Sequence, residues 1–198
     1  MSDLNRKSIH WSGKKMSIDQ QLLDGCIRGE RKAQYSLYKQ CYGILMAVCF
    51  RYERNKEDAE FLLNKAFLKI LNNLDSYSSS VPFEAWIRRI TINTAIDEYR
   101  KNQRSKVDYV EEPMQLASLE EMDYNDADKR FDAEELLALV QKLPPVSQKV
   151  FNLYIIDGYN HKEIAEKLGM SEGTSKWHLS SARKKLQEMM RKLMDNVA

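Results

Sequence analysis

The sequence predicts an all-α protein of two small helical domains, and three observations lead to that class. Apolar residues recur at helical spacing along most of the chain, and no segment shows a convincing strand pattern. Only 7 Gly and 4 Pro occur among 198 residues, so few hairpin turns are expected and long helices are favoured. An acidic stretch over residues 105–132 separates two helical segments, which predicts a linker between two domains.

The first domain is expected over residues 17–104. It follows a polar and basic tail, residues 1–16, which has no periodicity and is expected to be disordered. Ser17 lies three residues before Gln20, and this spacing predicts a capping box at the start of a first helix. Later helices of this domain are expected to continue through Phe50, to span residues 56–74, and to run from Pro82 to about Arg104.

The linker is strongly acidic. Residues 105–132 hold nine acids and three bases, which gives a formal charge of −6 in a chain whose total is +2. Pro113 and the absence of a regular pattern predict irregular structure there, and a solvated spacer is the simplest interpretation. The remainder of the chain therefore carries +2 − (−6) = +8, so two basic domains are joined by an acidic linker.

The second domain is expected over residues 133–198. Its predicted helices cover residues 133–143, 146–157, 160–168 and 171–193. Asn160 and Glu163 have the spacing of a capping box at the start of the third of these helices. Gly169 can adopt the left-handed conformation that ends it, and Ser171 can cap the next helix. This order predicts a helix-turn-helix whose second helix enters the major groove of DNA.

The outward face of that second helix is small, hydroxylic and cationic, which suits phosphates and base edges. Its members are Gly173, Lys176, Trp177, Ser180 and Lys184, with Arg183 at the edge. Ser175 occupies a position on the opposite, buried face, where an aliphatic residue is expected. A solvated amphipathic helix is the alternative interpretation, and Trp177 suits packing against the neighbouring helix as well as it suits contact with DNA.

A second basic helix lies in the first domain, over residues 82–104. A row at helical spacing consists of Arg89, Asn93, Asp97, Arg100 and Arg104. Such a row beside aromatic residues suits single-stranded or distorted nucleic acid, because cations follow the backbone while rings stack on bases. On composition alone, an ordinary solvated face is the alternative.

Two segments together resemble a known family. They read "FEAWIRRITINTAIDEYRKNQR" and "LPPVSQKVFNLYIIDGYNHKEIAEKLGMSEGTSKWHLSSARKKL", with the acidic linker between them. They resemble a bacterial RNA polymerase sigma factor of the sigma-70 family, in the extracytoplasmic-function (ECF) group that keeps only regions 2 and 4. The resemblance implies that the first domain is a region 2 helical bundle and the second a region 4 helix-turn-helix. It also implies a cytoplasmic protein that binds core RNA polymerase and promoter DNA and opens the DNA without a cofactor.

The resemblance implies roles for named residues. The −10 element would be read and melted by Trp86, Arg88, Arg89, Asn93, Asp97, Arg100, Lys101 and Arg104. The −35 element would be read by Ser171, Glu172, Gly173, Thr174, Lys176, Trp177, Ser180, Arg183 and Lys184. The loop of residues 76–81 would help to capture a flipped base. His178 and Ser181 stand where the family commonly has arginine, which would remove phosphate contacts.

Core polymerase would dock through its β′ clamp helices and its β flap. The residues implied for this contact in the first domain are Phe61, Asn64, Lys65 and Leu68. The family usually presents acids where Phe61 and Lys65 stand in this chain. The patch is therefore predicted to be apolar and positive, which would reverse the electrostatic steering of the partner at this point.

Other classes of function fit less well. A helix-turn-helix regulator that never engages polymerase is the alternative, but it leaves the basic helix of the first domain and the linker unexplained. An enzyme is not expected, because no phosphate loop, nucleophile motif or metal-ligand cluster is present. Cys26, Cys41 and Cys49 are expected to be small buried hydrophobes. Neither a signal peptide nor a membrane insertion is predicted, and an anti-sigma factor is left open as a further partner.

Overall fold

The computed structural model describes residues 18–104 and 133–195, and two compact units of the chain hold these two ranges. All regular structure within them is helical, which confirms the predicted all-α class. The predicted tail, residues 1–16, and the acidic linker, residues 105–132, lie outside the described residues, as does Ser17.

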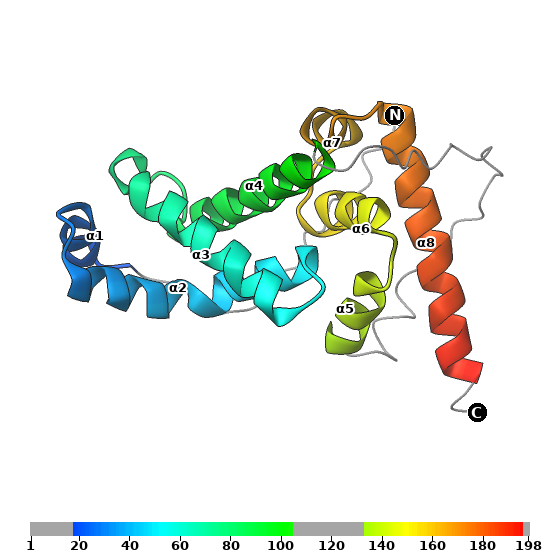
Figure 1. The fold of residues 1–198 in the computed structure, drawn as a ribbon, viewed down its shortest axis with the longest axis horizontal. Coiled ribbons are helices and arrows are strands. Elements are labelled where there is room, and N and C mark those ends of the chain that lie inside the picture. The colour runs from blue at the N-terminus through cyan, green and yellow to red at the C-terminus, as the bar shows by residue number, and fades with distance from the viewer. Residues whose placement is uncertain (1–17, 105–132, 196–198) are drawn as a thin grey trace. The chain divides into compact units, whose positions relative to one another are not determined.

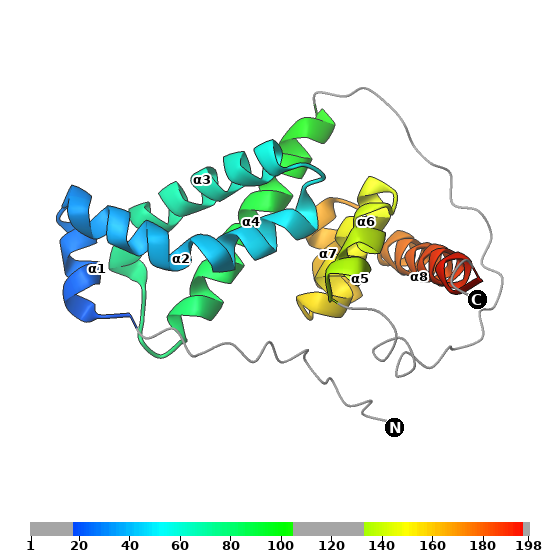
Figure 2. The ribbon, with the colours of Figure 1, turned by 90° about the horizontal axis from the view of Figure 1, so that it is seen from below.

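The unit of residues 18–104 is a bundle in which three long helices pack on one another. Its elements are α1 (Gln20–Ile27), α2 (Arg31–Tyr52), α3 (Lys56–Asn72), the 3-10 turn η1 (Leu74–Ser76) and α4 (Phe83–Arg104). Helices α2, α3 and α4 contact each other, and α1 packs against α2 (Figures 1 and 2). The core of this unit lies between these helices.

The start of α1 differs from the prediction. The helix begins at Gln20, and the carboxylate of Asp19 accepts the backbone N–H of Gln21 at 3.1 Å. The predicted capping box that begins at Ser17 is therefore wrong, because Asp19 is a strong capping residue placed directly before the first helical turn. Asn55 caps α3 in the same way, with its side-chain oxygen 2.8 Å from the backbone nitrogen of Asp58.

The apolar stripe of α3 faces the core as its helical spacing predicts. Its buried residues are Ala59, Leu62, Leu63, Ala66, Phe67 and Ile70. Helix α4 also buries two threonines, which it can do because each hydroxyl donates to a backbone carbonyl four residues earlier. The Thr91 hydroxyl lies 2.8 Å from the carbonyl oxygen of Ile87, and the Thr94 hydroxyl lies 2.8 Å from that of Ile90.

All three cysteines are free and buried in this unit, which confirms the packing role predicted for them. Burial raises the pKa of the Cys41 and Cys49 thiols to about 12. At neutral pH these thiols are therefore almost entirely protonated, and a protonated thiol is a poor nucleophile.

The unit of residues 133–195 contains the predicted helix-turn-helix. Its elements are α5 (Ala133–Gln141), α6 (Pro145–Phe151), the π-helical turn η3 (Asn152–Ile156), α7 (His161–Leu168) and α8 (Glu172–Asp195). Helix α8 packs against α6 and α7 (Figure 1). The single helix predicted over residues 146–157 is in fact α6 followed by η3, where the N–H of Asp157 donates to the carbonyl of Asn152, five residues earlier, at 2.9 Å.

Candidate nucleic-acid and polymerase interfaces

The turn between α7 and α8 is fixed by local hydrogen bonds. The side chain of Asn160 accepts the N–H of Glu163 at 2.9 Å, and the Glu163 carboxylate accepts the N–H of Asn160 at 2.7 Å. Gly169 has a φ of 71° in the left-handed region and ends α7. The Ser171 hydroxyl accepts the N–H of Thr174 at 3.0 Å and so caps α8. The predicted capping box, helix end and cap are all present.

Helix α8 has one buried and one open face. Ser175, Leu179, Ala182 and Leu186 are buried, as the helical wheel predicts. On the open face, exposed residues are Ser171, Glu172, Gly173, Lys176 and Lys184, and half-buried residues are Thr174, Trp177, Ser180 and Arg183. The residues implied for the −35 element therefore share an accessible face, while the Trp177 ring also contacts the neighbouring His178 ring, with centroids 4.8 Å apart.

Two histidine–serine pairs attach α8 to the rest of its unit. The Nδ1 atom of His161 on α7 lies 2.9 Å from the hydroxyl of Ser175, and the His161 ring stacks on Tyr154 at a centroid distance of 4.5 Å. On the other side, the Nδ1 atom of His178 lies 3.0 Å from the hydroxyl of Ser147 on α6. The first pair explains why a serine occupies the buried face of α8, because its hydroxyl is satisfied there.

His178 is only 7% exposed, so it belongs to the core of the unit. The ring faces Ser147 and not the open face of α8, so His178 is not placed to contact phosphates. His161 was not singled out by the sequence analysis. Burial lowers the pKa of His161, as do the positive charges of Lys176 and Arg183, while Glu172 opposes the shift.

The row on α4 is accessible, and two charges on its surface are already in ion pairs. Arg89, Arg100 and Lys101 are exposed and Asn93 is half-buried. Asp97 pairs with Lys69 of α3 at 2.9 Å, and Arg88, beside the row, pairs with Glu84, one turn earlier on α4, at 2.7 Å. The side chain of Arg104 lies outside the described residues.

An aromatic cluster joins the start of α4 to the loop before it. The Tyr77 ring lies 5.1 Å from the Phe83 ring and 5.2 Å from the Trp86 ring, measured between centroids. The Tyr77 hydroxyl donates to the carbonyl of Val81 at 2.9 Å, which closes the loop. Trp86 is half-buried in this cluster, so its ring is held in place beside the accessible row.

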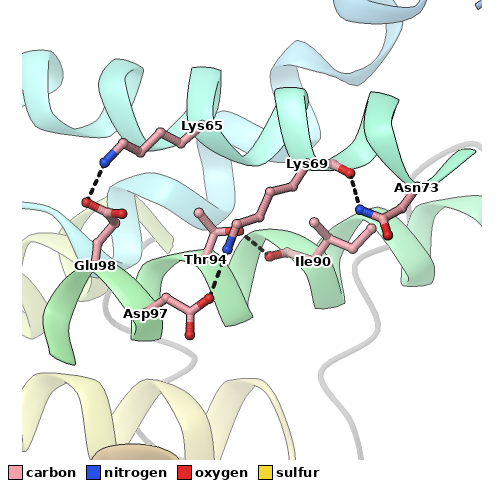
Figure 3. Close-up of polar contacts among 7 residues, drawn as sticks. All are labelled: Lys65, Lys69, Asn73, Ile90, Thr94, Asp97 and Glu98. Carbon is pink, nitrogen blue, oxygen red and sulfur yellow. Dashed lines mark hydrogen bonds and ion pairs between the residues drawn. The ribbon is translucent and has the colours of Figure 1, made fainter. Parts of the chain in front are cut away.

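The patch implied for core polymerase is apolar but is not strongly positive. Phe61 is 59% exposed and Leu68 is 58% exposed, and Asn64 accepts a hydrogen bond from the Tyr38 hydroxyl at 3.2 Å. Lys65 is half-buried, and its ammonium group lies 2.6 Å from the Glu98 carboxylate and 4.5 Å from the centre of the Phe61 ring. The prediction that the patch is positive is therefore wrong, because Glu98 compensates the charge of Lys65 (Figure 3).

Helix α2 adds aromatic residues that the sequence analysis missed. Tyr35 is 65% exposed and Tyr42 is 37% exposed, and Tyr38 between them contacts the Tyr42 ring and bonds to Asn64 of α3. The spacing of the three tyrosines, at i, i+3 and i+7, was the signal that could have placed them on one helix face. We call Tyr35, Tyr38, Tyr42, Phe61 and Leu68 the aromatic docking surface.

Within residues 18–104 and 133–195, no three His, Cys, Asp or Glu side chains gather as the ligands of a metal ion would. None of the helices in these ranges has the length and apolar character required to cross a bilayer.

Comparison with known proteins identifies the family. The family model described as Sigma-70 region 2 matches residues 37–105, and the one described as Sigma-70, region 4 matches residues 133–186. The chain is 25% identical to the ECF RNA polymerase sigma factor SigM of Mycobacterium tuberculosis over 186 residues, which cover 92% of this chain and 90% of SigM. It is 28% identical to the ECF RNA polymerase sigma factor SigE of Mycolicibacterium smegmatis over 149 residues, 73% of this chain but only 56% of SigE.

A solved structure is also similar. It is the sigma factor RpoE of Bartonella quintana in complex with the anti-sigma factor NepR, with a TM-score of 0.46 and 20% identity, over 79% of this chain and 97% of the matched chain. The two family matches fall on the two helical units in the order that the sequence predicts. The chain belongs to the sigma-70 family of RNA polymerase sigma factors, in its extracytoplasmic-function group.

Proposed function

We propose that this chain binds core RNA polymerase in the cytoplasm, directs it to a two-part promoter and opens the DNA at the start site. In this proposal α8 reads the −35 element in the major groove, and α4 holds the melted −10 element. The aromatic docking surface on α2 and α3 binds the polymerase. The chain itself is not an enzyme, and it uses binding free energy where an enzyme would use a cofactor.

One observation carries the proposal. A single chain presents an accessible cationic row on α4, an accessible helix-turn-helix face on α8, and a separate apolar surface that neither role needs. A regulator that binds only duplex DNA would need only the helix-turn-helix face on α8. DNA opening requires compensation for unstacked bases, about a few kcal/mol per base. The rings of Trp86 on α4 and of Tyr77 in the loop before it offer stacking partners.

Binding to core polymerase tests the proposal. The full chain, labelled with a fluorophore, is titrated with sigma-free core polymerase of its host, and the anisotropy is recorded. Saturable binding at nanomolar concentration is expected. If micromolar polymerase gives no binding while duplex DNA binding is intact, the chain is a helix-turn-helix regulator and the proposal is wrong.

A second measurement separates the two units. The sigma function requires α4 and α8 to act on one promoter, so inactivation of either face abolishes promoter-dependent transcription by the reconstituted polymerase. A plain regulator keeps its DNA binding when the α4 face is changed.

A further inference from the structure

Two ion pairs connect α3 to α4, and both have the same polarity. Lys65 pairs with Glu98 at 2.6 Å and Lys69 pairs with Asp97 at 2.9 Å. The two lysines lie one turn apart on α3, and the two acids are adjacent on α4 (Figure 3). Each acid of this part of α4 is therefore held by a cation from another helix.

Asp97 has a competing partner on its own helix. Arg100 is exposed and lies three residues after Asp97. Opposite charges at this spacing normally pair along a helix. Among the described residues, however, no carboxylate lies within ion-pair distance of Arg100, and the Asp97 carboxylate is turned toward Lys69 of α3 (Figure 3).

Stability alone does not account for the outer pair. The side chains of Lys69 and Asp97 are 46% and 58% exposed, and ion pairs this open contribute about 0–1 kcal/mol to folding. The helices already pack through buried residues such as Leu63, Ile70 and Ile87. The larger consequence is the position of charge on the accessible row of α4.

We propose that Lys69 is a positioning residue for nucleic-acid binding: it holds Asp97 away from Arg100 and so keeps that cation available to phosphates. The inference rests on the proposed function, because it assigns α4 to single-stranded promoter DNA. Loss of Lys69 frees Asp97 to pair along α4. A competing pair of the usual strength then occupies the arginine about two thirds of the time, against about a quarter to a half of the time when a Lys69 pair worth about 0–1 kcal/mol competes for Asp97. The loss of Lys69 therefore weakens binding about twofold.

The test is a double-mutant cycle on the full chain. Wild type, Lys69→Ala, Asp97→Asn and the double variant are titrated into a labelled single-stranded oligonucleotide of mixed sequence, about 20 nucleotides long, at low salt. Lys56→Ala is the matched control, since Lys56 also pairs with an acid, Glu60, at 3.7 Å, but within α3. It removes the same charge from the protein without touching an acid of the row.

Lys69→Ala is expected to weaken binding about twofold more than Lys56→Ala, and this excess disappears when Asp97 is already asparagine. Lys69→Arg, which keeps the pair, is expected to bind like the wild type. Circular dichroism and thermal unfolding confirm that each variant is folded. A purely structural role for Lys69 predicts a binding loss that is equal in both Asp97 backgrounds.

Each outcome decides between the claims. Equal loss in the two backgrounds, or a loss no larger than that of Lys56→Ala, overturns the inference and leaves the sigma function intact. If the wild-type chain binds no single-stranded DNA at micromolar concentration, the role of α4 in the proposed function fails as well, and the inference fails with it.

Discussion

Replacement of Phe61 by alanine tests the aromatic docking surface most sharply, because the ring is open to solvent in the free protein. A phenylalanine side chain can bury roughly 150–250 Å². With 59% of the residue exposed, roughly 120 Å² remains for a partner to cover. At about 25 cal/mol per Å², that area corresponds to about 3 kcal/mol, or a loss of affinity on the order of a hundredfold.

The assay is the anisotropy titration with core polymerase, and thermal unfolding serves as the stability control. Phe61→Ala is expected to leave the unfolding temperature nearly unchanged, because most of the ring is not packed. Ile27→Ala is the matched control, since Ile27 is 51% exposed but lies on α1, outside the docking surface. A loss for Phe61→Ala below about threefold, or one equal to that of Ile27→Ala, would refute the assignment of the surface to polymerase.

Three further predictions concern the helix-turn-helix unit. Because the pKa of His161 is lowered in the folded protein, the unfolded chain, with an ordinary histidine pKa of about 6.5, binds the proton more readily. The stabilising contribution of His161 is therefore complete above about pH 6.5 and is lost as the pH falls below it. The unfolding temperature should fall less steeply between about pH 7.5 and 5.5 for His161→Gln than for the wild type, and an unchanged slope contradicts this. Lys184→Ala should weaken duplex binding for all sequences and reduce the salt slope by about one, whereas Lys192→Ala on the last turn of α8 should leave the slope as it is. Gly169→Ala should lower the free energy of unfolding by about 1 kcal/mol in urea titrations. The cause is backbone strain at a φ of 71° and not a clash, because no atom lies within 4 Å of the added carbon. Gly43→Ala, inside α2, is the control and should not destabilise the protein.

The sequence predicted those features that depend on neighbours in the chain. Asn160, Glu163 and Gly169 act within one helical turn, so their residue types alone define where α7 begins and ends. The buried stripe of α3 follows from helical periodicity in the same way. The predicted start of α1 was wrong because Asp19, two positions after Ser17, is itself a strong capping residue and caps the helix.

Contacts between helices could not be predicted from the sequence. Lys65 meets Glu98 across 33 positions of the chain, and this pairing depends on the axial register of α3 against α4. The sequence therefore showed Lys65 in the patch implied for core polymerase, but it could not show that Glu98 compensates its charge. His161 and Ser175 likewise meet only after the turn is closed, so the serine was recognised as unusual while its partner was not.

The aromatic docking surface shows the same limit. Phe61 and Leu68, which the resemblance implies as polymerase contacts, are both exposed on α3. Tyr38 joins them only because α2 runs beside α3, with its hydroxyl 3.2 Å from Asn64, and Tyr35 and Tyr42 lie at helical spacing from Tyr38 on α2. The periodicity of one helix cannot show which face of the next helix lies beside it.

The most direct test of the central claim is transcription in vitro. Core polymerase of the host is incubated with genomic DNA fragments, with and without the full chain, and the 5′ ends of the transcripts are sequenced. The proposed function predicts new start sites that appear only with the chain, share two upstream sequence elements at a fixed spacing, and disappear when either the α4 or the α8 face is changed. If the start sites are the same with and without the chain, it does not act as a sigma factor, and the roles proposed for α4 and for the aromatic docking surface are wrong.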